Sequence, residues 1–194
     1  MVLSDRDIRA EIERGRIVID PFDPDLVQPA SVDLRLGKKF RRFTRDGSAF
    51  IDVRQNSPDL TSFEEIDEIQ PFILGPGEFA LAAVIERVEV PKDLAARLDG
   101  KSSLGRLGLL VHATAGWVDP GWKGHLTMEL SNVVNLPIRL YYGMRVAQIS
   151  FLRLSSPCEN PYGSRKLGSK YQGQSEPVPS KYYKYYEDKR SQRS

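Results

Sequence analysis

The sequence predicts a mainly β protein, a sandwich or a barrel of short strands that follows one short helix. Beyond residue 15, short runs of residues alternate between apolar and polar side chains, which is typical of half-buried strands. Thirteen prolines and 15 glycines interrupt these runs, as turn residues do in all-β sandwiches and barrels. A chain of 194 residues with 40% hydrophobic and 28% charged residues accommodates one such domain and a tail.

The helix is expected near the N-terminus, between Ser4 and Gly15. Ser4 is a favourable N-cap, and Asp7 follows three residues later in a capping-box arrangement. Leu3 and Ile8 are placed for a hydrophobic staple. Gly15 is a natural stop.

Short strands are expected through the middle of the chain, separated by proline and glycine. The clearest runs cover 79–84, 88–90, 125–130, 136–140 and 149–151. Residues 54–70, which include the acidic stretch 64–68, are expected to form an insertion loop.

Strand patterning fades near residue 155. We therefore expect one β domain at 1–154 and a polar arm at 155–194 that has too few apolar residues for a second core. Residues 181–186 read Lys-Tyr-Tyr-Lys-Tyr-Tyr. A solvated tail that packs on its own or a neighbouring subunit explains this stretch better than base stacking on nucleic acid does.

Charge and apolar patterning exclude several partners. The net charge of +2, from 28 Lys and Arg against 26 Asp and Glu, gives no basic face for nucleic acid. No apolar run approaches the ~18 residues that cross a bilayer, and no secretory leader precedes the domain. We therefore expect neither a nucleic-acid partner nor a membrane.

One cysteine and two histidines limit the chemistry. Cys158 has no partner for an intrachain disulfide, which suits a reducing, cytoplasmic compartment. A zinc deaminase holds its metal with a His or Cys and a Cys-x-x-Cys pair, which this chain lacks. His112 and His125 also lack the spacing of a zinc protease. Hydrolysis would then depend on carboxylates, backbone donors or a metal that the substrate carries.

The first candidate site, residues 101–106, reads Lys-Ser-Ser-Leu-Gly-Arg. Ser102 is placed to N-cap a short turn whose free N–H groups would bind an anion. Arg106 would then hold phosphate oxygens as a planar fork. An ordinary polar turn is the alternative, which these residues alone slightly favour, and the Walker order of a phosphate-binding loop is absent.

The second candidate is the bend at residues 114–122, which contains two tryptophans and Asp119. A flat ring beside an exposed carboxylate suits a sugar and its hydroxyl. The alternative is a tight Asp119-Pro120-Gly121 turn with tryptophan packed into the core. Local chemistry favours neither interpretation over the other.

The third candidate is the strand at 125–130. Alternation places Thr127 and Glu129 on the face opposite Met128. If that face is solvated, as is usual for strand glutamates, Glu129 has no special role. If the face lines a pocket, Glu129 becomes a candidate acid–base group.

The fourth candidate is the glycine-rich segment 162–174, which includes Tyr162, Lys170, Tyr171 and Gln174. Such a segment can order over a ligand and exclude water. A disordered linker is the alternative.

Taken in order, these segments resemble the dCTP deaminase branch of the trimeric dUTPase family over about residues 1–176. Residues 29–37 (Pro-Ala-Ser-Val-Asp-Leu-Arg-Leu-Gly), 101–106, 115–124 and 143–148 resemble its first four motifs, and the arm reads Gly-Ser-Lys-Tyr-Gln-Gly-Gln at 168–174. The resemblance implies a distorted β-barrel or jelly-roll-like subunit, with a C-terminal arm that closes over the active site. It also implies a homotrimer with active sites shared between neighbours.

The resemblance also implies roles for individual residues. Glu129 matches the acid–base residue for deamination, and Asp119 matches the residue that orients water at the α-phosphorus. Trp117 and Asp119 would lie around the deoxyribose, and backbone groups at 127–129 would read the base. The substrate-binding residues implied are Lys101, Ser102, Ser103, Leu104, Gly105, Arg106, Asp119, Thr127, Met128, Glu129, Gln148, Tyr162, Lys170 and Gln174.

Gly116 and Trp117 follow Thr-Ala where the resembled single-activity deaminases carry histidine. This points to the bifunctional type, which converts dCTP to dUMP, pyrophosphate and ammonia. We expect space near Gly116 for the attacking water and a close backbone approach there. Mg²⁺ would be bound by the phosphates of the substrate, without a protein ligand, and no zinc is expected.

Three alternatives remain open on the sequence. Instead of the bifunctional type, the chain could be a deaminase that releases dUTP, a plain dUTPase, or a non-catalytic nucleotide-binding trimer. The presence of Glu129 argues against the plain dUTPase, which has no amine to protonate.

Overall fold

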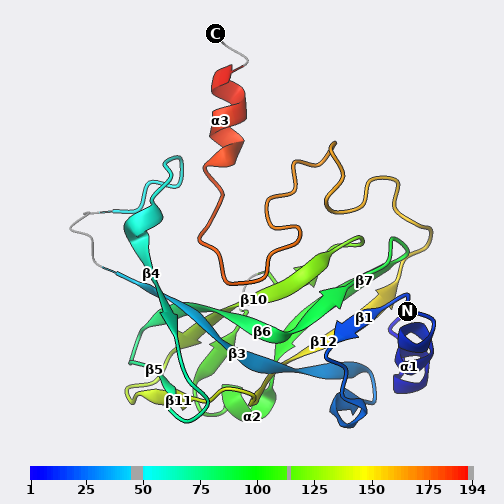
Figure 1. The fold of residues 1–194 in the computed structure, drawn as a ribbon, viewed down its shortest axis with the longest axis horizontal. Coiled ribbons are helices and arrows are strands. Elements are labelled where there is room, and N and C mark those ends of the chain that lie inside the picture. Colours follow the sequence, from blue (N-terminus) through cyan, green and yellow to red (C-terminus); the bar gives the residue numbers. More distant parts are fainter. Residues whose placement is uncertain (45–49, 113–114, 192–194) are drawn as a thin grey trace.

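A curled antiparallel β-sheet dominates the protein (Figure 1). The computed structural model describes residues 1–44, 50–112 and 115–191. The strands are β1 (Val18–Asp20), β2 (Val27–Gln28), β3 (Ser31–Phe43), β4 (Thr61–Glu65), β5 (Phe72–Leu74), β6 (Phe79–Glu89), β7 (Leu94–Gly100), β8 (Leu109–Val111), β9 (Trp117–Val118), β10 (Lys123–Asn132), β11 (Ile138–Leu140) and β12 (Arg145–Arg153).

Ten of these strands form the main sheet. Its central order is β8-β10-β6-β3-β12-β7-β9, with β1 beside β6 and with β2 and β4 beside β3, while β5 and β11 pair separately. The helices are α1 (Asp5–Glu13), α2 (Ser102–Gly105), α3 (Lys184–Ser191) and the 3-10 helices η1 (Pro24–Leu26) and η2 (Pro58–Leu60). The predicted mainly β fold class is therefore confirmed. Among the described residues, no helix is both long and apolar enough to span a bilayer.

Strand β10 shows how the predicted alternation becomes structure. Its even-numbered residues from Gly124 to Asn132 are buried, whereas Thr127 and Glu129 lie on the more exposed face. β10 pairs with β6 on one side and β8 on the other, so its buried face contributes Met128 to the hydrophobic core. Removal of such apolar side chains from water is the main force that stabilises the fold.

The two ends of the sheet approach each other, which gives the fold its barrel character. β8 stands at one end of the sheet order and β7 near the other. A Cβ on Gly100, the last residue of β7, would nevertheless lie only 3.2 Å from the Cβ of Val111 in β8. Within β3, a Cβ on Gly37 would lie 2.7 Å from the carbonyl oxygen of Ala83, and the β3–β6 register shifts next to this glycine. Such irregularities bend strands and allow the curl.

The predicted N-terminal helix is confirmed as α1. Ser4 occupies the N-cap, but its side chain makes no capping hydrogen bond. Leu3 and Ile8 are both fully buried, so apolar packing rather than the serine hydroxyl fixes the start of the helix. Gly15 has a φ of 65° and donates its N–H to the carbonyl of Ile12 at 2.8 Å, which ends it.

The prediction of an insertion loop at 54–70 is wrong in part. The segment contains η2 and β4, and β4 pairs with β3 from Lys39–Glu65 to Phe43–Thr61. Two of the acidic residues that suggested a loop, Glu64 and Glu65, lie on this added strand, where Glu64 accepts a hydrogen bond from Arg42 at 3.2 Å. Charged side chains are common on exposed edge strands, and the sequence pattern did not distinguish such a strand from a loop.

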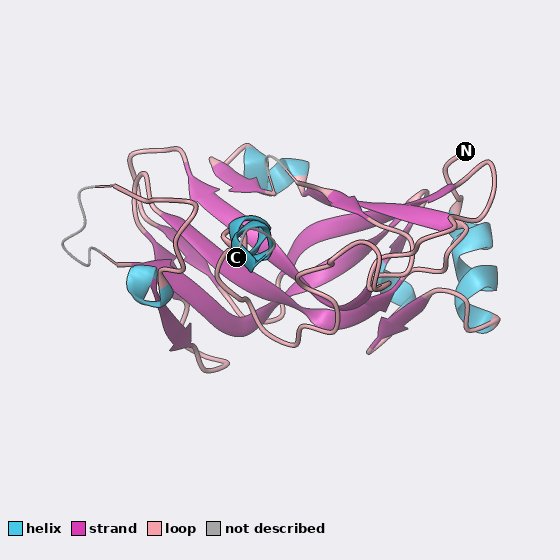
Figure 2. Cartoon of the chain, turned by 90° about the horizontal axis from the view of Figure 1, so that it is seen from above, coloured by secondary structure: helices cyan, strands magenta, loops and turns pink. Residues whose placement is uncertain are grey.

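The C-terminal region also differs from the prediction of an arm without packed elements. Between β12 and residue 191 the structure has no further strand, and residues 154–183 contain neither helix nor strand. The chain then forms α3, which projects from the body of the protein (Figure 1). Seen from above, α3 stands over the middle of the molecule and α1 lies at one end (Figure 2). Residues 192–194 of the predicted arm lie outside the described residues.

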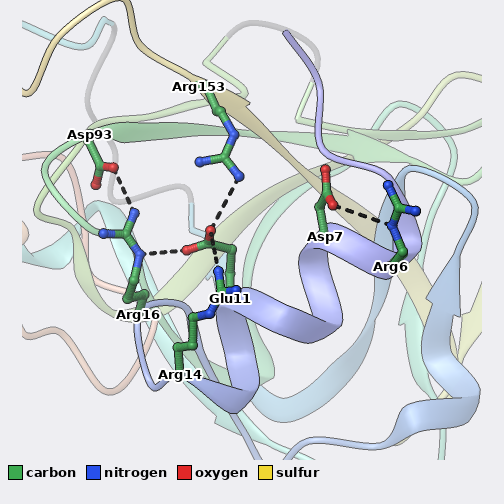
Figure 3. A network of polar contacts seen from close by, with 7 residues as sticks. All are labelled: Arg6, Asp7, Glu11, Arg14, Arg16, Asp93 and Arg153. Atoms are coloured by element: carbon green, nitrogen blue, oxygen red, sulfur yellow. Dashed lines mark hydrogen bonds and ion pairs between the residues drawn. The ribbon is translucent and has the colours of Figure 1, made fainter.

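An ion-pair network centred on Glu11 attaches α1 to the sheet (Figure 3). The Glu11 side chain is 3% exposed, and its carboxylate accepts a hydrogen bond from Arg16 at 2.6 Å and one from Arg153 in β12 at 3.3 Å. Arg16 also bonds Asp93 at 2.7 Å. Burial raises the pKa of Glu11, but the hydrogen bonds and charges of Arg16 and Arg153 lower it by more, so the net shift is downward.

We expect a Glu11→Gln substitution to lower the free energy of unfolding at pH 7 by about 1.5–3 kcal/mol, the range for hydrogen bonds to charged groups. Because the folded-state pKa of Glu11 is lowered, its contribution is present above the unfolded-state pKa of about 4.3 and is lost as the pH falls through the folded-state value. Urea unfolding of both proteins at pH 7, 5 and 3.5 should therefore show a difference that shrinks with acid.

The Asp7→Asn substitution provides a control on the same helix. Asp7 is 43% exposed and its carboxylate lies 3.7 Å from Arg6 (Figure 3). Such a surface pair contributes little, and we expect a cost below about 1 kcal/mol. A Glu11→Gln cost no larger than this, or one that does not change with pH, would contradict the assigned role of the network.

Candidate active site

The predicted site residues surround two pockets. The first, named here the β10 pocket, has a volume of about 420 Å³ and is lined by residues of β10, the bend that follows β9 and the C-terminal arm. The second, the α2 pocket, has a volume of about 350 Å³ and lies against α2 and β8. No residue lines both pockets, so a single chain presents the predicted site in two halves.

The β10 pocket brings together the two predicted catalytic carboxylates. Glu129 lines it from the half-buried face of β10, together with Thr127, and Asp119 lines it from the bend. Leu81 and Leu98 contribute apolar walls. Carboxylates that converge on a largely apolar cavity of this size are typical of a small-molecule site.

The interpretation of the bend as a tight turn with tryptophan in the core is confirmed, and the bend also lines the β10 pocket. The N–H of Trp122 donates to the carbonyl of Asp119 at 3.1 Å, which closes the expected turn, and Gly121 has a φ of 88°. Trp122 is buried in the core, whereas Trp117 is 56% exposed, and both rings line the β10 pocket. Thr114, the first residue of the predicted bend, lies outside the described residues.

The arm lies along β10 as a further wall of the pocket. His125 donates its N–H to the carbonyl of Gln174 at 2.9 Å, and the Gln174 amide donates to the Thr127 hydroxyl at 2.8 Å. The Tyr162 ring packs against Trp122, with 5.6 Å between ring centroids. Tyr162 and Gln174 both line the pocket, so the arm is ordered over it.

Burial raises the pKa of the Tyr162 hydroxyl above its ordinary value, although its hydrogen bond from the Tyr171 N–H acts in the opposite direction. The nearby Asp119 carboxylate also raises it. Tyr162 therefore stays protonated at neutral pH and presents an O–H donor beside the pocket.

Gly116 meets the expectation of a close backbone approach but not that of open space. Its carbonyl accepts a hydrogen bond from the Leu98 N–H at 2.7 Å. A Cβ on Gly116 would lie 2.4 Å from the Leu98 carbonyl oxygen. Because that neighbour is backbone, any side chain at position 116 would disturb the pairing of β7 and β9. The activity of a Gly116→His variant would therefore report this pairing as well as the space for the attacking water.

In the α2 pocket, strand pairing brings three of the resembled motifs together. β12 lies between β3 and β7, so Gln148 pairs with Asp33 on one side and Asp99 on the other. The Lys101 ammonium lies 2.5 Å from the buried Asp33 carboxylate. Lys101 therefore already has an anionic partner within the chain.

The predicted N-cap of this segment is corrected by one residue. Lys101, with extended φ and ψ of −86° and 126°, is the N-cap, and Ser102 is the first residue of α2. The reason is that β7 continues to Gly100 and the ion pair with Asp33 holds Lys101 at the end of the strand. The Ser102 and Ser103 hydroxyls are consequently exposed on the helix surface.

Residues 2–154 match the family described as dCTP deaminase-like.

The chain belongs to the dCTP deaminase-like family.

Similar proteins support the assignment. The protein named "dCTP deaminase, dUMP-forming" of Mycolicibacterium vanbaalenii is 59% identical over 186 residues, which cover 96% of this chain and 98% of that relative. The protein of the same name from Thermobifida fusca is 57% identical over 183 residues, 94% of this chain and 93% of the relative. The crystal structure of 2'-deoxycytidine 5'-triphosphate deaminase from Agrobacterium tumefaciens has a TM-score of 0.59 at 29% identity, and the match covers 77% of this chain but 47% of that chain.

Most residues suggested by this family resemblance fall into one of the two pockets. Trp117, Asp119, Thr127, Glu129, Tyr162 and Gln174 line the β10 pocket, and Lys101, Ser102, Gly105 and Gln148 line the α2 pocket. Ser103, Leu104 and Arg106 belong to α2 or follow it directly without lining either pocket. Lys170 lines neither, and the side chain of Met128 is fully buried, so only its backbone remains available to a ligand.

Sequence reasoning missed several contributors to the β10 pocket, and three of them carry rings. His112 lines it with a φ of 57°, and its Nε2 lies 2.8 Å from the Ala115 carbonyl. Phe43 and Phe79 form an edge-to-face pair at its rim, with centroids 5.4 Å apart. Their only signal in the sequence was their residue type, because β3, β6 and the bend meet through long-range pairing.

Proposed function

We propose that this chain hydrolyses dCTP to dUMP, pyrophosphate and ammonia with two molecules of water. The relatives named "dCTP deaminase, dUMP-forming" support this, since they are 57–59% identical over nearly the whole chain. The observation that carries the proposal is the pocket shared by Glu129 and Asp119. The pocket offers the Glu129 carboxylate to the cytosine ring and the Asp119 carboxylate to the deoxyribose and the α-phosphate.

In the first step, Glu129 takes a proton from water as the oxygen adds to C4 of cytosine. Glu129 then delivers protons to N3 and to the departing amine, so one carboxyl acts first as base and then as acid. Ammonia leaves and the ring becomes uracil. The apolar walls and the arm keep other water from the adduct.

In the second step, a water oriented by Asp119 attacks the α-phosphorus in line, and the bond to the pyrophosphate oxygen breaks. Ser102, Ser103 and Arg106 bind the triphosphate, because hydroxyls and a guanidinium suit phosphate oxygens. The other predicted ligands assist in binding the triphosphate. They are Gln148, Tyr162, Lys170 and Gln174. The first water supplies the oxygen at C4 of uracil and the second the oxygen on dUMP phosphate, so the atoms balance.

We propose that Mg²⁺ reaches the site on the triphosphate. Within the described parts of the chain, no group of three His, Cys, Asp or Glu side chains is placed to hold a metal ion. A substrate-borne ion suits this donor set, since Mg²⁺ commonly binds through phosphates and one or two carboxylates. When bound, it would neutralise charge on the leaving pyrophosphate.

We propose a cytoplasmic homotrimer whose active sites lie between subunits. One nucleotide must contact both halves of the site, which this chain keeps in separate pockets. Two segments close to the α2 pocket carry exposed apolar side chains: residues 107–110, which follow α2, and residues 133–136, which follow β10. The two segments are neighbours, because Val133 donates its N–H to the carbonyl of Gly108 at 3.0 Å. The exposed apolar side chains are Leu107, Leu110, Val133, Val134 and Leu136. Exposed apolar groups of this kind mark subunit interfaces.

Mixing two inactive variants tests the shared site. Arg106→Ala disables the phosphate half and Glu129→Gln the deamination half. If each site takes these halves from different subunits, random mixed trimers should regain roughly a quarter of wild-type ammonia release. Activity is measured after co-refolding, with each variant refolded alone as the control. Absence of any recovery would contradict the shared site.

Product analysis tests the proposed function itself. Purified protein is incubated with dCTP and Mg²⁺, and the nucleotides are separated. Formation of dUMP with ammonia is expected. Accumulation of dUTP would remove the second step and make the chain a single-activity deaminase, and unchanged dCTP would remove the proposed reaction.

A further inference from the structure

The predicted phosphate ligand Lys170 is held by a tyrosine of the C-terminal helix. Its ammonium lies 3.1 Å from the centroid of the Tyr185 ring, a cation–π contact. Its neighbour Tyr171 lines the β10 pocket, whereas Lys170 lines neither pocket. Lys170 lies in a bend, and its ammonium is held on the Tyr185 ring rather than in the cavity.

The segment that supplies Tyr185 is attached to the body of the protein. We call residues 177–187 the strap. Arg41 in β3 donates to the Pro177 carbonyl at 2.7 Å. Lys181 donates its N–H to the Tyr171 hydroxyl at 2.9 Å and its ammonium to the Lys170 carbonyl at 3.1 Å. The strap, which is part of the arm, is therefore fixed to the barrel at its start and to residues 170 and 171 in its middle.

We propose that the strap competes with the triphosphate for Lys170 through Tyr185 and so lowers the affinity for the nucleotide. The inference rests on the proposed function for its ligand. To reach a phosphate, Lys170 must leave the Tyr185 ring, and the loss of that contact counts against binding. Cation–π contacts change an equilibrium by roughly 2- to 30-fold, depending on solvent exposure. Tyr185 is 56% exposed, which favours the lower part of that range.

Steady-state kinetics with Tyr185→Leu tests the competition. We expect the KM for dCTP to fall about 2- to 5-fold with kcat unchanged, because the variant removes the contact that holds Lys170 back. The variant also removes the edge-to-face contact of Tyr185 with Tyr182, whose effect the Lys170→Met background separates. Tyr185→Phe keeps the ring and should restore the wild-type KM. Tyr183→Leu removes a tyrosine from the same strap and is the matched control, since no aromatic or cation–π contact of Tyr183 is recorded among the described residues.

A second background separates competition from a general structural effect. In Lys170→Met, the Tyr185→Leu change should have no effect on KM, because the contested ammonium is absent. If Tyr185→Leu raises KM, or lowers it equally in the Lys170→Met background, the inference is overturned. These outcomes are read only from proteins that form ammonia from dCTP, so they are distinct from failure of the proposed function.

A readout without catalysis decides the inference independently. Wild type, Tyr185→Leu and Tyr185→Phe are treated briefly with an amine-acylating reagent, and modification of Lys170 is measured by mass spectrometry relative to the exposed Lys166. Lys170 modification should rise at least about 2-fold in Tyr185→Leu and stay at the wild-type level in Tyr185→Phe. Equal modification in all three proteins would show that Tyr185 does not hold Lys170.

Discussion

Replacement of Glu129 by glutamine is expected to reduce ammonia release from dCTP by about 10²- to 10⁴-fold, the contribution typical of general acid–base catalysis. Glutamine has nearly the same volume, so the half-buried face of β10 and the walls of the pocket are retained. It cannot take a proton from water or return one to N3. The measurement is single-turnover ammonia release at saturating dCTP.

The same variant contains its own control. Conversion of dUTP to dUMP involves no amine, so Glu129→Gln should retain it within a few-fold of wild type. This activity would also show that the barrel, the arm and the phosphate half of the site are intact. Ammonia release within a few-fold of wild type would remove Glu129 from the mechanism.

The elements that could be predicted from the sequence are those whose evidence is local. α1 depends on a contiguous stretch bounded by Ser4 and Gly15, and β10 depends on the alternation that buries Met128 and places Glu129 on the opposite, half-buried face. The bend at Asp119 was predicted from Pro and Gly. In each case neighbours in the chain determine the conformation.

The features that were not predicted depend on distant partners. β4 forms by pairing with β3, which is distant in the sequence. α3 forms where the composition alone indicated an unstructured arm. The division of the site is also non-local, since β12 joins β3 and β7 at Gln148 while the arm follows β10 at Gln174. Four motifs in order indicate a shared chemistry, but they do not indicate which of them one subunit brings together.

The two-pocket arrangement changes how the motif residues are interpreted. Lys101 was expected among the substrate-binding residues, yet its ammonium pairs with the buried Asp33. Removing Lys101 would leave the buried Asp33 carboxylate with the more distant Arg145 guanidinium at 3.7 Å, a weaker compensation for its charge. Loss of activity in a Lys101 variant would therefore report the loss of the ion pair with Asp33 as well as any contact with substrate. Ser102 and Ser103, exposed on α2, test the phosphate site more directly.

Replacement of Asp119 by asparagine is expected to convert the enzyme into one that releases dUTP. Asparagine keeps the size of the side chain, and the turn itself is closed by backbone, through the Asp119 carbonyl and the Trp122 N–H. The carboxylate that orients the attacking water is lost, so hydrolysis at the α-phosphorus should fall by about 10²- to 10⁴-fold. Ammonia release, which depends on Glu129, should remain within about tenfold of wild type. Separation of the nucleotides after one turnover should show dUTP in place of dUMP.

The comparison with Asp59→Asn makes this result specific to the pocket. Asp59 is exposed in η2 and lines neither pocket, so that variant should form dUMP as the wild type does. If Asp119→Asn still forms dUMP at the wild-type rate, the water is oriented by another group. If it loses both ammonia release and dUMP formation together, Asp119 acts on the deoxyribose before either step, because both reactions need the sugar in place. Only the separation of the two activities assigns Asp119 to the second one, and it does so because the carboxylates share one pocket but act on different atoms of one nucleotide.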